Sequence, residues 1–243
     1  MKIYIGTSGW QYHHWKSKFY PEDLNPKDWL EFYSKYFNTV EINTSFYHQT
    51  RKTTFEKWKD IIKDKNFKFS IKLYRLFTHF RRLNLDKDNK RILKETLNNY
   101  FSLKENLGPI LIQLPPSLKL DLEKLKKFIK EIKRIREEIL LSIEFRNKSW
   151  LNDEVYKILK DENVAFCISD SPRWQTDFAK TADFVYVRFH GRPLFAGKYS
   201  EDELKKWAVK IKKLKPKKVF IYFNNDFEGY AVENAIYMKK ILR

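Results

Sequence analysis

Short apolar stretches recur along the chain, and each is followed by a longer segment with helical periodicity. Eight of these stretches have the length and the β-branched or aromatic content of buried strands. The segments between them repeat apolar residues every three or four positions, which is typical of helices that cover one side of a sheet. The predicted strands are residues 2–6, 39–43, 68–72, 109–114, 140–145, 164–169, 184–189 and 219–223, and the predicted helices lie near 26–37, 52–63, 90–106, 121–138, 150–162, 200–214 and 227–241.

This alternation predicts the fold class. Eight strands that alternate with helices over 243 residues are the count of a (β/α)8 barrel, the TIM barrel. A doubly wound open sheet is the alternative, but its usual first turn, G-x-G-x-x-G, does not match GTSGWQYHHW here. The segment 171–182, SPRWQTDFAKTA, is too short and polar to predict a long helix. Since no linker or composition change divides the chain, we predict one TIM-barrel domain over residues 1–243.

Polar residues gather at the carboxyl ends of the predicted strands, opposite the apolar face. In SIEFRNKSW, Glu144 and Arg146 share one side of the strand, while Ile143 and Phe145 take the other. The helix ring of a barrel covers the apolar face, so the polar residues are expected to point inward at the mouth, where this fold builds its active sites. By the same reasoning the mouth receives Glu41, Asn43, Lys72, Gln113, Asp170, Arg188, His190, Asn224 and Asn225.

The predicted mouth residues fit acid/base chemistry on an anionic ligand. Carboxylates in different environments can serve as acid and base, and lysine and histidine also transfer protons. Arginines bind phosphate or carboxylate through two hydrogen bonds. A buried ion network with a structural role alone is the alternative. The candidate catalytic residues are Glu41, Glu144, Asp170, Lys72 and His190, and the candidate ligand-binding residues are Arg146, Arg188, Gln113, Asn43, Asn224, Asn225, Trp10 and Tyr47.

The carboxylates allow a second use, which is metal binding. Glu41, Glu144 and Asp170 are the candidate ligands for a divalent cation such as Mg²⁺ or Mn²⁺. Three cationic side chains predicted in the same mouth compete with a metal ion, and the histidines lack H-E-x-x-H or Cys/His ligand spacing. The cofactor is therefore left open. The single cysteine, Cys167, is predicted by alternation to face the helices as a small buried side chain.

The charge balance bears on the partner. The chain has 49 basic and 31 acidic residues and a net charge of +18. This excess has two explanations: an anionic partner such as nucleic acid, or helices whose outer faces are solvated by lysine. Loops at the predicted mouth, GWQYHHWKSKFYP and LYRLFTHFRRL, interleave aromatic and basic residues. This composition suits stacked bases with their phosphates, or an aromatic-walled pocket for a phosphorylated small molecule.

The sequence says less about the cellular compartment and the oligomeric state. No apolar run approaches the roughly 20 residues that span a bilayer, and the amino-terminal apolar stretch is too short for a signal peptide. One cysteine provides no disulfide framework. We expect a cytoplasmic protein without a membrane partner, and the oligomeric state is left open.

Several motifs, in order along the chain, resemble the domain-of-unknown-function 72 family, also called YecE-like. They are IGTSGW with HWK and FYP, FNTVEIN with SFY, FSIK, GPILIQLPPS, IEFRNKSW, DFVYVRFHG, and YFNND followed by GYAVENA. The resemblance covers nearly the whole chain and implies a TIM barrel, but no established reaction. A similarity of this family to endonuclease IV-like barrels hints at DNA, although the multi-zinc histidine ligands of those enzymes have no counterpart here. His48 stands where the family often has arginine.

These observations lead to one hypothesis and two alternatives. The leading hypothesis is an enzyme, with hydrolases as the first class to consider, whose mouth binds a phosphate-bearing ligand such as a nucleic acid or nucleotide. The first alternative is a non-catalytic barrel that binds nucleic acid through its basic and aromatic loops. The second is an isomerase or lyase that acts on a sugar or sugar phosphate.

Overall fold

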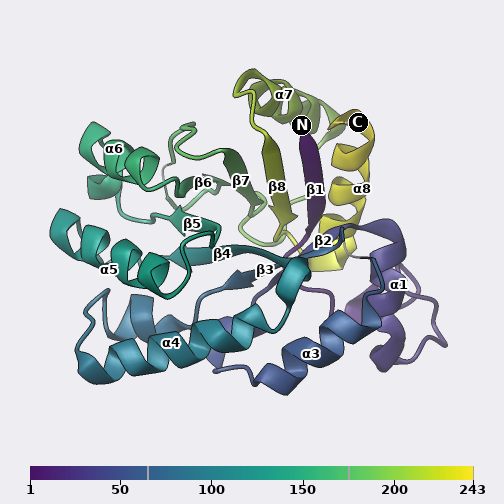
Figure 1. The fold of residues 1–243 in the computed structure, drawn as a ribbon. Coiled ribbons are helices and arrows are strands. Elements are labelled where there is room, and N and C mark those ends of the chain that lie inside the picture. The colour runs from purple at the N-terminus through teal and green to yellow at the C-terminus, as the bar shows by residue number, and fades with distance from the viewer. Residues whose placement is uncertain (65, 175, 243) are drawn as a thin grey trace.

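The strands of the computed structural model, which describes residues 1–64, 66–174 and 176–242, form a barrel (Figure 1). All of them pair in parallel, in the order β1-β8-β7-β6-β5-β4-β3-β2. The predicted fold class is confirmed, because eight parallel strands alternate with helices in a nearly closed (β/α)8 barrel. The strands are β1 (Lys2–Thr7), β2 (Thr39–Ile42), β3 (Lys68–Lys72), β4 (Leu107–Gln113), β5 (Leu141–Glu144), β6 (Ala165–Asp170), β7 (Phe184–Phe189) and β8 (Lys218–Phe223).

Helices lie outside the strands, and the two ends of the chain lie near each other beside β1 and α8 (Figure 1). None of the helices in the described ranges combines the length and apolar character needed to cross a membrane. Between β6 and β7 the described residues form no helix, and Gln175 lies outside them. The helices are α1 (Trp29–Tyr36), α2 (Thr44–Tyr47), α3 (Lys52–Ile61), α4 (Lys87–Phe101), α5 (Leu122–Ile135), α6 (Asp153–Asp161), α7 (Glu201–Lys213) and α8 (Tyr230–Leu242).

Short helical turns occupy the connections. A π-helix, Leu76–Phe80, follows β3, and such irregular turns are frequent at functional sites. The short 3₁₀ helices are His13–Trp15, Pro26–Asp28, Lys104–Asn106, Lys148–Trp150 and Phe227–Gly229.

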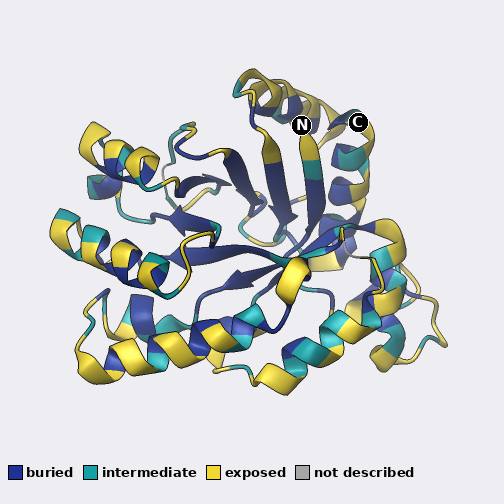
Figure 2. Ribbon diagram, in the orientation of Figure 1, coloured by how far each residue is buried: buried dark blue, intermediate teal, exposed yellow. Residues whose placement is uncertain are grey.

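Helix α5 shows why the basic composition is compatible with a packed barrel. Its side chains Leu125, Phe128 and Ile129 are buried, whereas the helix face that points outward is exposed (Figure 2). The helix begins where the Asp121 carboxylate accepts a hydrogen bond from the backbone N–H of Lys124 at 3.0 Å. Each buried apolar side chain stabilises the fold by roughly 1.5–3 kcal/mol. Much of the lysine in this helix therefore solvates its outer face.

The barrel interior changes from apolar to polar along its axis. The rings of Tyr4 and Phe220 stack at 4.6 Å as part of an apolar inner cluster. Farther along β8, the hydroxyl of Tyr222 hydrogen-bonds to Thr39 Oγ1 at 2.7 Å and to Ser70 Oγ at 2.6 Å. Polar side chains at the carboxyl end thus rest on aromatic rings that fill the lower barrel.

Strand β6 has the opposite phase to the one predicted. Cys167 belongs to the inner cluster with Tyr186 and Tyr222, so the prediction that it faces the helices is wrong. Phe166 packs with the outer core instead. Because side chains alternate along a strand, Asp170 then falls on the side away from the barrel axis.

Strands β1 and β2 meet without a backbone ladder in the described residues, since they stand at the two ends of the strand order. The side chain of Asn38 takes the place of part of the missing ladder. Its Oδ1 accepts a hydrogen bond from Ile5 N at 3.2 Å, and its Nδ2 donates to Ile3 O at 2.8 Å. An amide side chain offers both a donor and an acceptor, so it satisfies one strand edge as a neighbouring strand would.

The hydroxyl of Tyr33 on α1 bridges the two strands nearer the mouth. It accepts a hydrogen bond from Thr7 N at 2.9 Å and donates to Thr39 O at 3.0 Å. Gly6 permits this close approach, because a Cβ at that position would lie 2.0 Å from Thr39 O. We call this contact, formed by Gly6, Tyr33 and Asn38, the β1–β2 seam.

We predict that Tyr33→Phe lowers the free energy of unfolding by about 1–3 kcal/mol, because the Thr7 N–H and the Thr39 carbonyl lose a buried partner. Urea denaturation followed by circular dichroism measures the change. Tyr36→Phe, at an exposed position on the same helix, is the matched control and is expected to change stability by less than about 0.5 kcal/mol. Equal effects of the two substitutions would contradict this role of the seam.

Candidate functional site

A cavity of about 510 Å³ opens at the carboxyl-terminal mouth of the barrel. Seven of the residues predicted from the sequence line it: Asn43, Tyr47, Lys72, Gln113, Arg146, Arg188 and Asn224. They come from the ends of β2, β3, β4, β5, β7 and β8 or from the loops that follow, so the convergence results from the barrel itself. The other lining residues are Tyr12, Phe46, His79, Phe195 and Asp226.

The floor of this mouth cavity is a buried ion cluster centred on Arg188. Its Nη2 lies 2.8 Å from Glu41 Oε1 and its Nη1 lies 2.5 Å from Glu144 Oε2. Both glutamates are 0% exposed. Burial alone lowers the pKa of Arg188, but the two carboxylates raise it well above its usual value. The guanidinium is therefore permanently charged and held in one orientation.

Hydroxyl groups complete the environment of Glu41. Tyr186 donates to Oε2 at 2.6 Å, and Ser8, just beyond β1, donates to Oε1 at 2.7 Å. With Arg188 also bound, both carboxylate oxygens are satisfied. Glu41 therefore positions Arg188 from below, and it is not among the cavity-lining residues.

Glu144 holds a second arginine in place. Arg146 Nε donates to Glu144 Oε1 at 2.6 Å, and the guanidinium lies over the Trp174 ring at 4.1 Å. Burial on its own raises the pKa of Glu144, but Arg146 and Arg188 together lower it well below its usual value. The Nη groups of Arg146 make no hydrogen bond to a described residue. The two Nη groups of Arg146, which we call the arginine fork, are thus left for a ligand.

Lys72 contrasts with the two arginines, because no carboxylate in the described residues forms an ion pair with its Nζ. Its Nζ lies 3.9 Å from the centre of the Phe46 ring, and the side chain is 9% exposed. No ion pair or hydrogen bond joins Nζ to any residue that the structure describes. Burial and then Arg188 lower the pKa of Lys72 to about 7. Neutral and charged lysine therefore coexist near neutral pH.

Two histidines near the mouth are neutral. Burial lowers the pKa of His190 to about 4 despite the Glu144 carboxylate, whose Oε2 lies 3.8 Å from Nε2. Nδ1 of His190 accepts from the Asn224 amide at 3.2 Å, which leaves the proton on Nε2. His79, on the π-helix, lines the cavity, and burial followed by Lys72 lowers its pKa to about 4. His190 is fully buried and does not line the cavity.

Asp226 is a lining residue that the sequence reasoning did not identify. Its Oδ1 accepts a hydrogen bond from Trp15 Nε1 at 2.7 Å, and its Oδ2 lies 3.1 Å from His14 Nε2. Burial raises the pKa of this carboxyl above its usual value. The signal was present in YFNND, but alternation along β8 stops at the strand end and cannot place a residue in the next turn.

Three predicted site residues lie apart from the mouth cavity. Asp170 pairs with Arg192, which is an exposed residue. The Asn225 amide donates to Gly197 O at 2.9 Å and so supports a loop. The Trp10 ring packs edge-on against Trp58 at 5.1 Å. None of the three lines the cavity.

This separation bears on the candidate metal ligands. The structure does not bring Asp170 to Glu41 and Glu144, because the phase of β6 turns Asp170 away from the barrel axis. Each of the three carboxylates is paired with an arginine instead. In the described part of the chain, no group of three or more His, Cys, Asp and Glu side chains is arranged to hold a metal ion.

The aromatic residues of the mouth loops have two different roles. Trp15, Tyr20 and Trp150 are buried in the core and are not free to stack on a base. Tyr47 and Phe195 are 53% and 44% exposed and line the cavity. Most of the aromatic content of these loops therefore serves packing, and a small part of it forms cavity walls.

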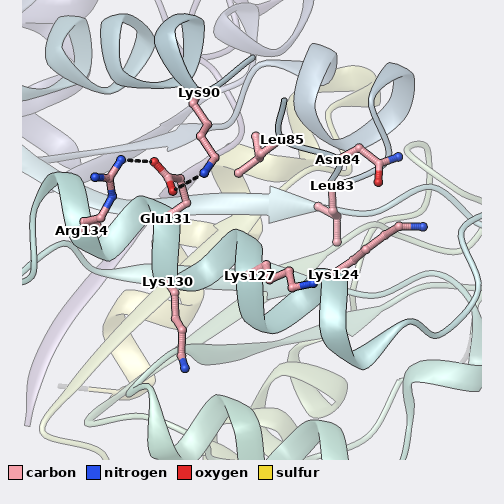
Figure 3. A pocket seen from close by; sticks show the side chains of 9 residues that line it. All are labelled: Leu83, Asn84, Leu85, Lys90, Lys124, Lys127, Lys130, Glu131 and Arg134. Atoms are coloured by element: carbon pink, nitrogen blue, oxygen red, sulfur yellow. Dashed lines mark hydrogen bonds and ion pairs between the residues drawn. The ribbon is translucent and has the colours of Figure 1, made fainter. Parts of the chain in front are cut away.

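A second cavity, of about 490 Å³, lies between α4 and α5 (Figure 3). Its acidic residue, Glu131, is paired with Lys90 at 3.2 Å and with Arg134 at 2.6 Å. Lys127 and Lys130 also line it and are exposed. Unlike Lys72, these lysines stand in solvent on the outer surface, so they provide matched controls for the mouth lysine.

The fold and the polar mouth define a protein of the TIM-barrel class. The chain matches the model described as protein of unknown function DUF72 over residues 4–243, and it belongs to that family, as its motifs predicted. The UPF0759 protein YunF of Bacillus subtilis (strain 168) is 28% identical, over 99% of this chain and 94% of YunF. No reaction follows from these family names.

Solved structures agree with the family assignment. A DUF72 family protein from Thermotoga maritima MSB8 is 27% identical with a TM-score of 0.85, covering 100% of this chain and 99% of that one. The D-psicose 3-epimerase of Clostridium cellulolyticum H10 is 9% identical with a TM-score of 0.56, covering 100% and 96%. The latter likeness shows the barrel fold alone.

We predict that Glu144→Gln lowers the free energy of unfolding by about 3–5 kcal/mol at neutral pH, because two arginines lose a buried charged partner. The folded-state pKa of Glu144 is depressed. Its contribution to stability is therefore present above the usual carboxyl pKa of 4.5 and is lost as the pH falls through the folded value. Denaturant unfolding at a series of pH values measures both effects.

The matched control for this prediction is Glu123→Gln, an exposed carboxylate on α5. It is expected to change stability by less than about 0.5 kcal/mol at any pH. The difference between wild type and Glu144→Gln should shrink in acid. A difference that stayed constant as the pH fell would contradict the assigned charge state of Glu144.

Proposed function

We propose that this protein is an enzyme that binds a small phosphate-bearing molecule in the mouth cavity and transforms it by acid/base chemistry. The observation that supports this most directly is the direction of the charges. Arg146 and Lys72 face the cavity with donors that no described residue uses, whereas Glu144 lies beneath them, fully buried. A ligand entering the mouth therefore meets cations first.

Unsatisfied polar atoms support a ligand at this position. Buried polar groups are nearly always hydrogen-bonded, so each exception calls for a partner. Asn43 Oδ1, Arg188 Nε, Trp174 Nε1 and His190 Nε2 are buried without one. Asn43 and Arg188 line the cavity, and Trp174 contacts both Arg146 and His190. At Asn43 Oδ1 and Arg188 Nε, a bound anion with hydroxyl groups would supply a donor and an acceptor.

Lys72 and Asp226 are the proposed proton-transfer groups. A general base works best when its pKa lies near the working pH, which holds for Lys72 with a pKa of about 7. Asp226 lines the same cavity and has a raised pKa, which suits a carboxyl that both holds and releases a proton. Glu41 and Glu144 are proposed as positioning residues, because arginine binding occupies them.

The dimensions favour a small molecule over a polynucleotide. A cavity of about 510 Å³ is in the range of small-molecule and cofactor sites, roughly 300–1,000 Å³. Binding of a nucleic acid strand usually uses a row of exposed aromatic rings, and Trp15 and Tyr20 are buried. A nucleotide or a sugar phosphate fits this combination of a cationic floor and two aromatic walls.

We predict that inorganic phosphate binds the mouth and that Arg146→Met weakens this binding by about 10-fold or more, because a charge-assisted hydrogen-bonding fork is removed. Isothermal titration calorimetry at low salt gives the dissociation constants. Arg134→Met, which removes an exposed arginine at the second cavity, is the control and should leave the affinity unchanged. Equal losses in both variants would indicate nonspecific attraction to a basic protein.

The pH dependence of anion binding tests the role of Lys72. Sulfate keeps its charge between about pH 6 and about pH 9, so any change reports on the protein. Raising the pH through about 7 neutralises Lys72, and sulfate binding should weaken several-fold. Lys72→Met should remove this dependence, whereas Lys127→Met should keep it. Sulfate binding that still weakens as the pH rises in Lys72→Met would refute the assignment of this pH dependence to Lys72.

Catalysis is tested separately from binding. Sugar phosphates and nucleotides that displace sulfate are incubated with the protein and followed by proton and phosphorus NMR. An enzyme converts at least one of them, and Lys72→Met loses conversion while Lys127→Met retains it. Displacement without conversion across the whole set would support a binding protein instead.

A further inference from the structure

We infer that Lys72 forms an imine with its ligand, so that the substrate class is a small aldehyde or ketone that carries a phosphate group. This inference rests on the proposed function, because it assigns a covalent role to the lysine of the same cavity. It goes further by naming the second functional group of the ligand. The phosphate would bind at the arginine fork, and the carbonyl carbon would meet Nζ.

The position of Lys72 meets the steric demands of a nucleophilic amine. It is the last residue of β3, and the Ser45 hydroxyl donates to its carbonyl oxygen at 2.8 Å, which fixes the backbone. Its Nζ lies over the Phe46 ring and lines the cavity. Lys90, an exposed lysine at the second cavity, is paired with the Glu131 carboxylate, and a paired ammonium is not a nucleophile. Lys72 is buried yet open to the cavity.

The charged groups around Lys72 favour its neutral form. Arg188 from β7 and Arg146 beyond β5 disfavour a third positive charge, and their effect adds to that of burial. Glu144 and Glu41 act in the opposite direction, but both are engaged by Arg188. With a pKa of about 7, a large fraction of Lys72 is the free amine at neutral pH.

The proposed step balances without an oxidant or reductant. The neutral Nζ attacks the carbonyl carbon, a C–N bond forms, and the carbonyl oxygen takes up a proton to give a carbinolamine. The C–O bond of the carbinolamine then breaks, the hydroxyl leaves as water with a second hydrogen taken from the nitrogen, and the C=N bond of the imine forms. Asp226 is the carboxyl in the cavity wall that can supply and recover the proton. Protonated imines weaken bonds next to the former carbonyl carbon, which suits aldol cleavage or dehydration.

Reductive trapping tests the inference directly. The full-length protein is incubated with dihydroxyacetone phosphate, glyceraldehyde 3-phosphate or pyridoxal 5′-phosphate, and sodium cyanoborohydride reduces any imine to a stable secondary amine. Intact mass and peptide mapping then locate the adduct. At least one probe is expected to modify Lys72 selectively, and sulfate should suppress the modification. Dihydroxyacetone, which lacks phosphate, should label Lys72 at least about 10-fold less.

Matched variants keep this experiment decisive. Lys127→Met removes a lysine of the second cavity and should label like wild type, whereas Lys72→Met should lose the adduct. Lys72→Arg keeps a cation at the position and should bind sulfate without forming an adduct. Adducts distributed equally over Lys127 and Lys72, or none at Lys72 with any probe, would overturn the inference.

The two proposals fail in different ways. Wild-type protein that binds phosphate and sulfate at Arg146 but forms no adduct at Lys72 refutes the imine and leaves the proposed function intact. Selective labelling of Lys72 that neither sulfate nor Arg146→Met reduces refutes the phosphate site, and with it the substrate class inferred here.

Discussion

The burial of Arg188 between Glu41 and Glu144 is the interaction on which the mouth depends. An ion taken out of water costs several kcal/mol, so none of the three side chains is stable at this depth without the others. The sheet brings them together, since β2, β5 and β7 direct their carboxyl ends to the same rim. Apolar replacements often stabilise a protein equally well. We therefore attribute this cluster to the need for rigid cations at the mouth.

The buried carboxylates of the cluster hold positively charged side chains in fixed positions at the mouth. Glu144 uses one oxygen for Arg188 and the other for Arg146, so a single carboxylate fixes two guanidinium groups. The same cations disfavour a charge on Lys72. One arrangement thereby supplies both the arginine groups of the proposed anion site and an amine with a lowered pKa, and these two properties have one cause.

The barrel could be predicted from the sequence because its strands are short, apolar and regularly spaced. The site was predictable where alternation continued to the strand end, as for Lys72, Gln113 and Arg188, all of which line the cavity. The orientation of side chains on β6, including Cys167, could not be predicted, because an apolar strand buried on both faces shows no alternation. Asp226 lies in a turn, and turns follow local geometry that strand patterns do not describe.

The β1–β2 seam has a consequence for how the circle is completed. Elsewhere neighbouring strands are joined by main-chain pairing, but here Tyr33 and Asn38, which belong to the connection between the two strands, make the closing contacts. These side chains hold the first strand against the second in place of main-chain pairing. The gap between β1 and β2 is therefore bridged by side chains that lie close in the sequence, whereas the two strands most distant in the sequence, β1 and β8, are joined by a parallel main-chain ladder.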